Sequence, residues 1–252
     1  MSRHFISVDS NLEGGRIVVS GKTAHHILSV LRLRIGDELT FCDGNELDYH
    51  AVLADFNAKS RSASAVFEIK KTVQCLNELP FFVRLFQCLP KGDKLDLIIQ
   101  KCTELGVSEI IPVYSTRSDV GAKALGKRFE RCQAIAASAA GQSNRGKVPI
   151  ICCLHNFDDA VQNLKSLRQS ANVLSVVAYE NEKNATLKSV VLNQSNPPSV
   201  VNLFIGPEGG FTNEEIQILK DAGVFVVSLG TLTLRTETAA IAAVSQIVCL
   251  LG

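Results

Sequence analysis

The sequence lacks the signatures of a membrane protein or an exported protein. No apolar run reaches the roughly eighteen residues that a membrane-spanning helix needs, and the longest apolar segments are interrupted by charges. The first fifteen residues, MSRHFISVDSNLEGG, contain no apolar stretch of the kind found in signal peptides. These absences predict a cytoplasmic protein. With 252 residues, 46% of them apolar, the chain can bury one large core or two smaller ones.

Metal-binding and disulfide patterns are also missing. The eight cysteines form no Cys-x-x-Cys pair and no cluster with histidine at zinc-finger spacing. Most have apolar neighbours, as Cys249 has in SQIVCLLG. We therefore expect reduced, buried thiols that pack as small apolar side chains, and no metal site.

Two nucleotide-binding motifs are absent as well. The chain has neither the P-loop pattern GxxxxGK[ST] nor the dinucleotide pattern GxGxxG after its first strand. The usual methyltransferase glycine motif also fails, because the glycine-rich segment comes late in the chain. These absences disfavour a nucleotide-dependent oxidoreductase.

Charge is distributed unevenly along the chain. Residues 84–147 carry 11 Lys and Arg against 6 Asp and Glu, and residues 1–34 carry 5 against 2. Residues 148–252 are acidic, with 6 against 9. Local basic surface suits a polyanionic partner, although ordinary solvated helix faces would give the same counts.

The N-terminal third has the pattern of a small, mostly β domain. Residues 37–56 contain two β-compatible runs around Asp43-Gly44, a favoured type I′ hairpin turn. Residues 23–34 form the one helical pattern, and another strand is expected over 62–71. The periodicity changes after residues 73–80, which we interpret as a linker.

From residue 81 onward, strands and helices alternate. A helix over residues 91–106 should stop at Gly106, and another should begin after Asn156 as its N-cap. Thr212 and Glu215 match a capping box at the start of a third helix. Alternation with fully apolar strands predicts a mostly parallel α/β sheet.

Three unusual loops follow strands of this sheet. They are AYENE (178–182), the turn GPEGG (206–210) and the segment SLGTLTLRTETAA (228–240). Because the carboxyl ends of parallel strands meet at one edge, the three loops should line a shared pocket. Glycines without a phosphate cradle suit a ligand held by backbone groups, such as an adenosine moiety. A simple tight turn at 206–210 is the alternative.

Several motifs carry a family resemblance. LFIGPEGGF and LGTLTLRTETAAIAAVSQ resemble the two cofactor-loop motifs of the SPOUT methyltransferases. KGDKLDLIIQKCTELGVSEIIPVYSTRS and the N-terminal RHF and HHILSVLRLRIGDELTFCDG are similar to the branch that methylates uridine N3 in 16S ribosomal RNA of the small subunit, the RsmE family. The resemblance spans almost the whole chain, with the motifs in the family's order.

The resemblance implies an α/β fold with a PUA-like β-barrel that binds RNA over residues 1–72 and a knotted SPOUT methyltransferase domain over residues 73–252. It also implies a trefoil knot, a homodimer and S-adenosylmethionine as cofactor. The cofactor-binding residues that it implies are Ala178, Tyr179, Glu180, Ile205, Gly206, Pro207, Gly209, Gly210, Leu229, Gly230, Leu234, Thr236, Thr238 and Ala239. The glycines among them would let main-chain atoms approach the cofactor where a Cβ would collide.

The chemistry of uridine methylation suggests further residues. N3 must lose a proton before it attacks the methyl group, so a cation near O2 or O4 would stabilise the developing anion. Arg235 and Arg145 are the candidates, with a helix-mouth ion pair to Glu237 as the alternative role for Arg235. Glu208 orients the loop or the substrate, or stabilises the loop by a hydrogen bond. No general base is singled out.

RNA contacts are expected from positions spread over both halves of the chain, each of which could instead be an ordinary surface residue. They are Arg3, His4, His26, Arg32, Arg34, Lys91, Lys94, Arg117 and Gln142. The chain departs from the family pattern at Leu232 and Thr233, and within residues 141–145. The altered segment 141–145 leaves open a non-catalytic RNA-binding or ribosome-assembly factor. A SPOUT enzyme with a different RNA target is a second alternative.

Overall fold

The computed structural model describes residues 3–5, 12–57, 63–118, 128–167 and 172–252, with Arg3 and residues 165–167 described through their backbone alone. The chain forms two compact units. The N-terminal unit comprises Met1–Glu78 and Ala140–Lys147, and the C-terminal unit comprises Leu79–Ala139 and Val148–Gly252. Each unit has a sheet and a core of its own.

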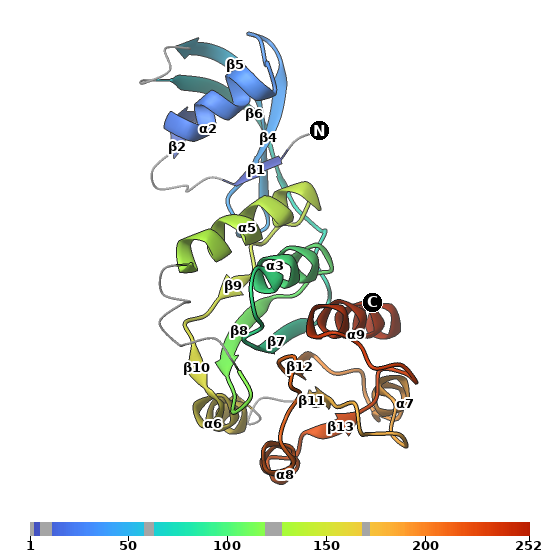
Figure 1. Cartoon of the computed structure of the whole chain (residues 1–252). Helices are drawn as coiled ribbons and strands as arrows, with labels where there is room; N and C mark the ends of the chain where they lie inside the picture. Colours follow the sequence, from blue (N-terminus) through green and yellow to red (C-terminus); the bar gives the residue numbers. More distant parts are fainter. Residues whose placement is uncertain (1–2, 6–11, 58–62, 119–127, 168–171) are drawn as a thin grey trace. The chain divides into compact units, whose positions relative to one another are not determined.

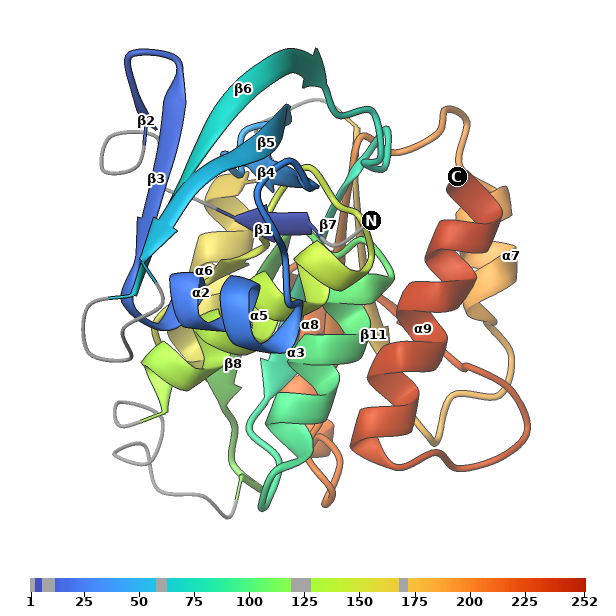
Figure 2. The same ribbon diagram turned by 90° about the horizontal axis from the view of Figure 1, so that it is seen from above.

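The N-terminal unit is built on a curled six-stranded sheet (Figures 1 and 2) with the order β1-β4-β5-β6-β3-β2. Its strands are β1 (Arg3–Phe5), β2 (Leu12–Glu13), β3 (Arg16–Ser20), β4 (Glu38–Cys42), β5 (Leu47–Asn57) and β6 (Ser64–Gln74). The β1–β4 pair is parallel and the other pairs are antiparallel. Alternate side chains point inward, and Phe41 meets Phe67 edge to face at 4.8 Å between ring centroids in the middle of this core.

Two local predictions for this unit differ from the structure. The hairpin between β4 and β5 closes through a four-residue loop, because the Asp43 carboxylate accepts hydrogen bonds from the amides of Asn45 and Leu47. The type I′ turn is therefore wrong, and positive φ occurs at Gly44 and Glu46. The expected helix divides into α2 (Gly21–His25) and the π-helix η1 (His26–Val30).

A short segment from the second half of the chain completes the N-terminal unit. Residues 140–147 bond to it through Gly146, whose carbonyl oxygen accepts a 3.1 Å hydrogen bond from the amide of Glu46. A Cβ on Gly146 would lie 3.1 Å from Sγ of Cys75, so the close fit favours glycine. Residues 140–147 are far in sequence from the rest of this unit, so the sequence did not predict that they belong to it.

The C-terminal unit is a parallel sheet with the order β10-β8-β7-β12-β11-β13, and β9 pairs with β8. The strands are β7 (Phe82–Cys88), β8 (Glu109–Tyr114), β9 (Ile150–Ile151), β10 (His155–Asn156), β11 (Val173–Ala178), β12 (Val200–Ile205) and β13 (Phe225–Val227). The helices are α3 (Lys94–Glu104), α5 (Phe129–Gln142), α6 (Phe157–Leu167), α7 (Leu187–Leu192), α8 (Asn213–Asp221) and α9 (Thr236–Leu251). Every strand pair of this sheet in the described ranges is parallel, as the alternation predicts.

Helices cover both faces of this sheet (Figure 1). On β12, Leu203 and Ile205 pack towards α3, α7 and α9, whereas Phe204 packs towards α6 and α8. Phe204 stacks on Phe86 of β7 at 4.2 Å between ring centroids. A strand that is buried on both faces explains why its sequence is continuously apolar.

The predicted helix ends are confirmed. Thr212 Oγ1 accepts from the amide of Glu215, and the Glu215 carboxylate accepts from the amide of Thr212, which completes the capping box. Asn156 Oδ1 accepts a 2.8 Å bond from the amide of Asp159 at the start of α6. Gly106 ends the α3 segment with a φ of +99°.

All eight cysteines are free thiols. Five are buried, as expected, but Cys249 and Cys153 are exposed, so the prediction for Cys249 is wrong. No helix within the described ranges is both long and apolar enough to cross a membrane. Among these residues, no group of His, Cys, Asp and Glu side chains is arranged to hold a metal ion.

Candidate functional site

A cavity of about 370 Å³ opens at the carboxyl edge of the parallel sheet, where β11, β12 and β13 end. The three loops singled out in the sequence line it together. The predicted cofactor residues that line it are Ala178, Tyr179, Glu180, Ile205, Gly206, Pro207, Gly209, Gly210, Leu229, Gly230, Leu234, Thr236 and Ala239, joined by Glu208 and Arg235. Thr238 is exposed on α9 and does not line it.

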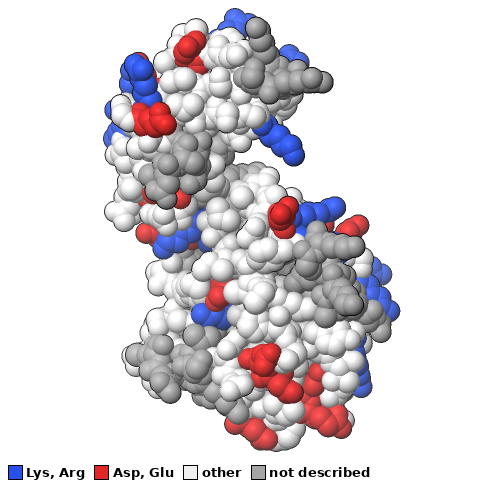
Figure 3. All heavy atoms as spheres, turned by 90° about the vertical axis from the view of Figure 1, so that its left-hand side faces the viewer, with Lys and Arg blue, Asp and Glu red and all other residues white. Residues whose placement is uncertain are grey.

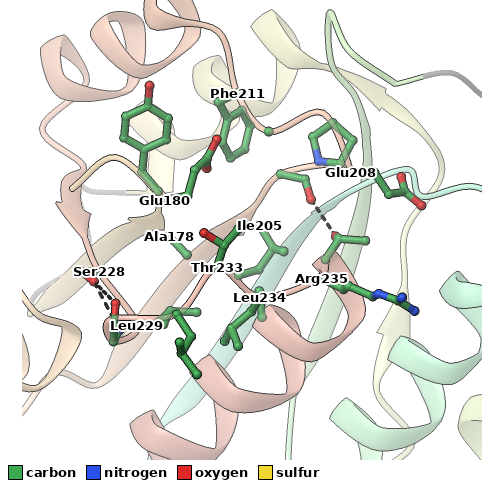
Figure 4. A pocket seen from close by; sticks show the side chains of 18 of the residues that line it. Ala178, Glu180, Ile205, Glu208, Phe211, Ser228, Leu229, Thr233, Leu234 and Arg235 are labelled. Atoms are coloured by element: carbon green, nitrogen blue, oxygen red, sulfur yellow. Dashed lines mark hydrogen bonds between the residues drawn. The ribbon is translucent and has the colours of Figure 1, made fainter. Parts of the chain in front are cut away.

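Charged and apolar groups occupy different parts of the cavity (Figure 4). Ile205, Leu229 and Leu234 form an apolar floor, with Glu180 at one side. Glu208 and Arg235 extend from the opposite side. A volume of this size, lined by both apolar and polar groups, suits a small ligand.

The glycine turn of this cavity lies close to several side chains of the protein. Gly210 has a φ of +67°, and its amide donates to the carbonyl oxygen of Pro207 at 2.9 Å. A Cβ on Gly206 would lie 3.2 Å from the ring of Phe211, one on Gly209 would lie 3.2 Å from Arg117, and one on Gly210 would lie 2.5 Å from the Glu180 carboxylate. The glycines thus make room for the protein's own side chains around the cavity.

A buried hydroxyl relay holds the start of this turn. Thr236, the first residue of α9, donates from Oγ1 to the carbonyl oxygen of Gly206 at 2.6 Å. Gln87 at the end of β7 donates from Nε2 to the same hydroxyl at 3.0 Å. Gln87 is fully buried, so the relay ties three chain segments together away from water.

The middle of the turn is held by Glu208. Its Oε1 accepts a 2.6 Å bond from Lys94 Nζ and a 3.1 Å bond from the amide of Lys91. Partial burial raises the pKa of Glu208, but the hydrogen bonds from Lys94 and from the backbone outweigh this effect, and the net pKa lies below its ordinary value. A carboxylate that stays ionised in these bonds stabilises the loop.

Arg235 lies at the N-cap position of α9, and its side chain is exposed. Glu237 lies within 3.9 Å of Lys94 Nζ, and in the described ranges no carboxylate pairs with Arg235. Within this part of the chain, the helix-mouth ion pair is therefore not formed. The guanidinium remains available beside the cavity.

The end of the turn contacts Arg117, which follows β8. The Arg117 guanidinium donates to the carbonyl oxygen of Gly209 at 2.8 Å and to that of Phe211 at 3.4 Å. The third loop, residues 228–240, has a hydrogen bond of its own: Ser228 Oγ donates to the carbonyl oxygen of Gly230 at 2.8 Å (Figure 4).

Arg145 does not line the cavity. It belongs to the N-terminal unit, where it is 4% exposed and its Nη2 lies 2.7 Å from Oε2 of Glu78. The same carboxylate accepts hydrogen bonds from the amides of Gly146 and Lys147. The structure therefore gives Arg145 a role in holding residues 140–147 in that unit.

Predicted RNA contacts in the N-terminal unit lie on β1, on η1 and just after it, and at the end of α5. His4 lies 5.7 Å from His26 between ring centroids, and burial followed by the charge of His26 lowers the pKa of His4. Arg32, Arg34 and Gln142 are exposed, and the side chain of Arg3 lies outside the described residues. Basic and acidic side chains intermingle on the face that Figure 3 shows.

Five residues that were not predicted as site residues also belong to this site. Phe211, Ser228, Thr231, Leu232 and Thr233 also line the cavity. Their membership in the three loops was a sufficient signal for most of them. For Gln87, which supports the site through Thr236, the sequence signal is weaker: it is a polar residue within an apolar strand at the same edge of the sheet.

Comparison with known proteins identifies the chain. The RNA methyltransferase domain family matches residues 77–248, and the RNA methyltransferase PUA domain family matches residues 19–60. Ribosomal RNA small subunit methyltransferase E of Bacillus subtilis (strain 168) is 35% identical over 262 residues, which cover 98% of this chain and 96% of that protein. The chain belongs to the ribosomal RNA small subunit methyltransferase E family.

Two solved structures are similar throughout. Ribosomal RNA small subunit methyltransferase E from Neisseria gonorrhoeae bound to S-adenosyl methionine is 30% identical, with a TM-score of 0.83 over 99% of this chain and 98% of that chain. A putative methyltransferase from Legionella pneumophila in complex with SAM is 28% identical, with a TM-score of 0.83 over 98% and 96%. Family membership confirms the expected α/β methyltransferase fold with an N-terminal PUA-like domain.

Proposed function

We propose that this protein transfers the methyl group of S-adenosylmethionine to N3 of a uridine in 16S ribosomal RNA. One observation carries the proposal: in a chain of this methyltransferase family, three strand-end loops enclose a single cavity of about 370 Å³. The cytoplasm is the proposed location, since that is where ribosomal RNA is found. The substrate is either free RNA or the assembled small subunit.

The residues present fit the cofactor. Ile205, Leu229 and Leu234 offer an apolar surface to an adenine ring, and the Glu180 carboxylate can attract a cationic group or accept from a hydroxyl. A Cβ on Gly230 would meet nothing within 4 Å, and its φ of +143° favours glycine. Backbone groups of the third loop are thus open to a ligand. When bound, S-adenosylmethionine supplies a methyl group on a sulfonium, which is an activated donor.

The chain's own residues would then orient the uridine and stabilise charge. We assign Arg235 the task of stabilising the negative charge that develops on a uracil oxygen as N3 loses its proton. Its exposed guanidinium beside the cavity and the lack of a carboxylate partner in the described ranges support this role. Glu208 and Thr236 keep the turn in place, and Arg145 stabilises the N-terminal unit.

The PUA-like domain supports an RNA substrate, with His4, His26, Arg32 and Arg34 as proposed contacts. A homodimer is proposed from two features of the C-terminal unit. The last helix carries no charged residue from Thr238 to Leu251, and Leu232 at the cavity edge is 78% exposed. An apolar helix surface and an exposed leucine favour cover by a second copy. The knot and the division at residues 72 and 73 remain part of the proposal.

The non-catalytic alternative loses its main support. It rested on the altered segment 141–145, and none of these residues lines the cavity. Gln142 is exposed, and Arg145 is buried in an ion pair within the N-terminal unit.

Primer extension on 16S ribosomal RNA tests the proposal, because an N3-methyl group blocks base pairing. A strain without the protein should lose one strong stop, and a plasmid that encodes the wild type should restore it. Unchanged stops would refute the proposed target. Purified protein with labelled S-adenosylmethionine should methylate either free RNA or small subunits from the deletion strain, and this comparison identifies the substrate form.

A further inference from the structure

Arg117 bridges the carbonyl groups of Gly209 and Phe211, the residues that flank the left-handed residue Gly210. One nitrogen, Nη1, donates to the carbonyl oxygens of Gly209 at 2.8 Å and Phe211 at 3.4 Å. Gly209, Gly210 and Phe211 all line the cavity. The position of this guanidinium therefore bears directly on the shape of the cavity wall.

The backbone around Arg117 is also held in place. It lies in a turn between Ser115 and Ser118, which are 1% and 6% exposed and whose hydroxyl oxygens lie 3.0 Å apart. The neighbouring amide of Thr116 donates to Oε1 of Glu215 at 2.8 Å, and Glu215 caps α8 at the end of the same loop. This turn and the glycine loop are thus bonded at two points, through Glu215 and through Arg117.

Gly209 fits against the aliphatic part of Arg117. A Cβ built on Gly209 would lie 3.2 Å from Cβ and 3.3 Å from Cδ of Arg117. Gly209 is not among the residues with positive φ, so its backbone conformation does not require glycine. The space that Arg117 occupies therefore disfavours a larger residue at this position.

We propose that Arg117 is a positioning residue for the cofactor pocket, and that Gly209 is glycine because the Arg117 side chain lies against it. The inference rests on the proposed function, since it concerns the affinity of the same cavity for S-adenosylmethionine. It differs from a phosphate-contacting role, which would place the effect of Arg117 on RNA binding. Charge-assisted hydrogen bonds of this kind are stronger than neutral ones, so losing two of them should weaken cofactor binding about tenfold.

A double-mutant cycle in the full-length protein tests the contact. The variants are Arg117→Ala, Gly209→Ala and the double substitution, with Arg131→Ala as the matched control. Arg131 is a surface arginine of α5 whose side chain is 63% exposed and pairs with Asp96, so its removal should leave cofactor affinity unchanged. Calorimetry with S-adenosylmethionine gives the affinities, and filter binding at several salt concentrations gives RNA affinity.

Each single substitution should raise the Kd for S-adenosylmethionine, Arg117→Ala by about tenfold and Gly209→Ala by about threefold or more. In the Arg117→Ala background, Gly209→Ala should add less than it does alone, because the contact with Cδ at 3.3 Å is gone and only the contact with Cβ at 3.2 Å remains. RNA affinity and its salt dependence should change less than about twofold. Arg117→Lys should recover part of the affinity, since lysine can donate to one carbonyl.

Three outcomes would overturn the inference. Arg117→Ala with wild-type cofactor affinity but weaker RNA binding and a smaller salt slope would make Arg117 a phosphate contact. If the effects of Arg117→Ala and Gly209→Ala on the Kd were additive, Gly209 would not be glycine on account of Arg117. Wild-type protein that binds no S-adenosylmethionine would overturn the proposed function as well, and thermal unfolding of the same four proteins would still measure the Arg117–Gly209 coupling by itself.

Discussion

The hydroxyl of Thr236 donates a 2.6 Å hydrogen bond to the carbonyl oxygen of Gly206 and accepts one from Gln87. This relation joins the start of the last helix to the start of the glycine turn, across 30 residues of sequence. Both residues line the cavity, so the hydroxyl links the stability of the fold to the shape of the site.

Thr236→Val should destabilise the protein by about 1–3 kcal/mol, because it leaves the buried Gly206 carbonyl and the Gln87 amide without their partner. Cofactor affinity should fall as well, since the turn is released. Thr236→Ser keeps the hydroxyl and is the matched control. Thermal unfolding and calorimetry measure the two effects, and equal behaviour of the valine and serine variants would contradict the relay.

Arg235→Ala should lower kcat for methyl transfer by about 10²–10³-fold, the range seen when a group that stabilises developing charge is removed. The Kd for S-adenosylmethionine should change little, because the guanidinium extends from the side of the cavity opposite Glu180. Arg235→Lys should keep part of the rate. Single-turnover assays with saturating RNA separate the effect on methyl transfer from the effect on binding. A kcat within about threefold of wild type would show that Arg235 does not take part in methyl transfer.

Much of this architecture could be predicted from the sequence because it depends on local patterns. The Thr212–Glu215 capping box, the stop at Gly106 and the apolar strands each leave a signal within a few residues. The three loops could be grouped because parallel strands end at one edge of a sheet.

The remaining features depend on contacts between distant segments. Gln87 and Thr236 are 149 residues apart, and nothing in either segment indicates their hydrogen bond. A lone arginine is usually exposed, so the burial of Arg145 against Glu78 could not be anticipated. Glycine indicates a close approach but does not identify the neighbour, so the side chains beside Gly206, Gly209 and Gly210 could not be predicted.

The Glu208–Lys94 pair should make the loop sensitive to acid. The pKa of Glu208 lies below its ordinary value of 4.5, so its stabilising contribution is present above that value and is lost as the pH falls through the lower folded-state pKa. Both side chains are about one-third exposed, at 33% and 28%, so the contribution should be only about 0.2–1 kcal/mol. Glu208→Gln should remove this part of the acid dependence in thermal unfolding between about pH 3 and pH 7.

Glu104→Gln is the matched control for this prediction. It removes a comparably exposed ion pair, with Lys101 on α3, that does not involve the cavity. Glu208→Gln should therefore weaken S-adenosylmethionine binding, whereas Glu104→Gln should not. Equal cofactor affinity in both variants would show that Glu208 does not support the loop.

The buried pair of Glu78 and Arg145 should contribute far more to stability than the exposed pair beside it. Glu78→Ala leaves the Arg145 guanidinium, 4% exposed, without this carboxylate and removes the acceptor for two backbone amides. Breaking a buried pair from one side costs about 3–5 kcal/mol. Lys147→Ala breaks a 2.8 Å pair with Glu46 whose side chains are 52% and 31% exposed, and it should cost less than about 1 kcal/mol.

Chemical unfolding of the two variants measures this difference, and RNA affinity and methyl transfer distinguish its consequences. If Arg145 acts through structure, Arg145→Ala should lower the unfolding midpoint of the N-terminal unit while folded protein at low temperature retains methyl transfer within about tenfold, because a catalytic arginine would cost more. If a stable Arg145→Ala variant transferred methyl groups about 10³-fold more slowly, Arg145 would instead act in catalysis.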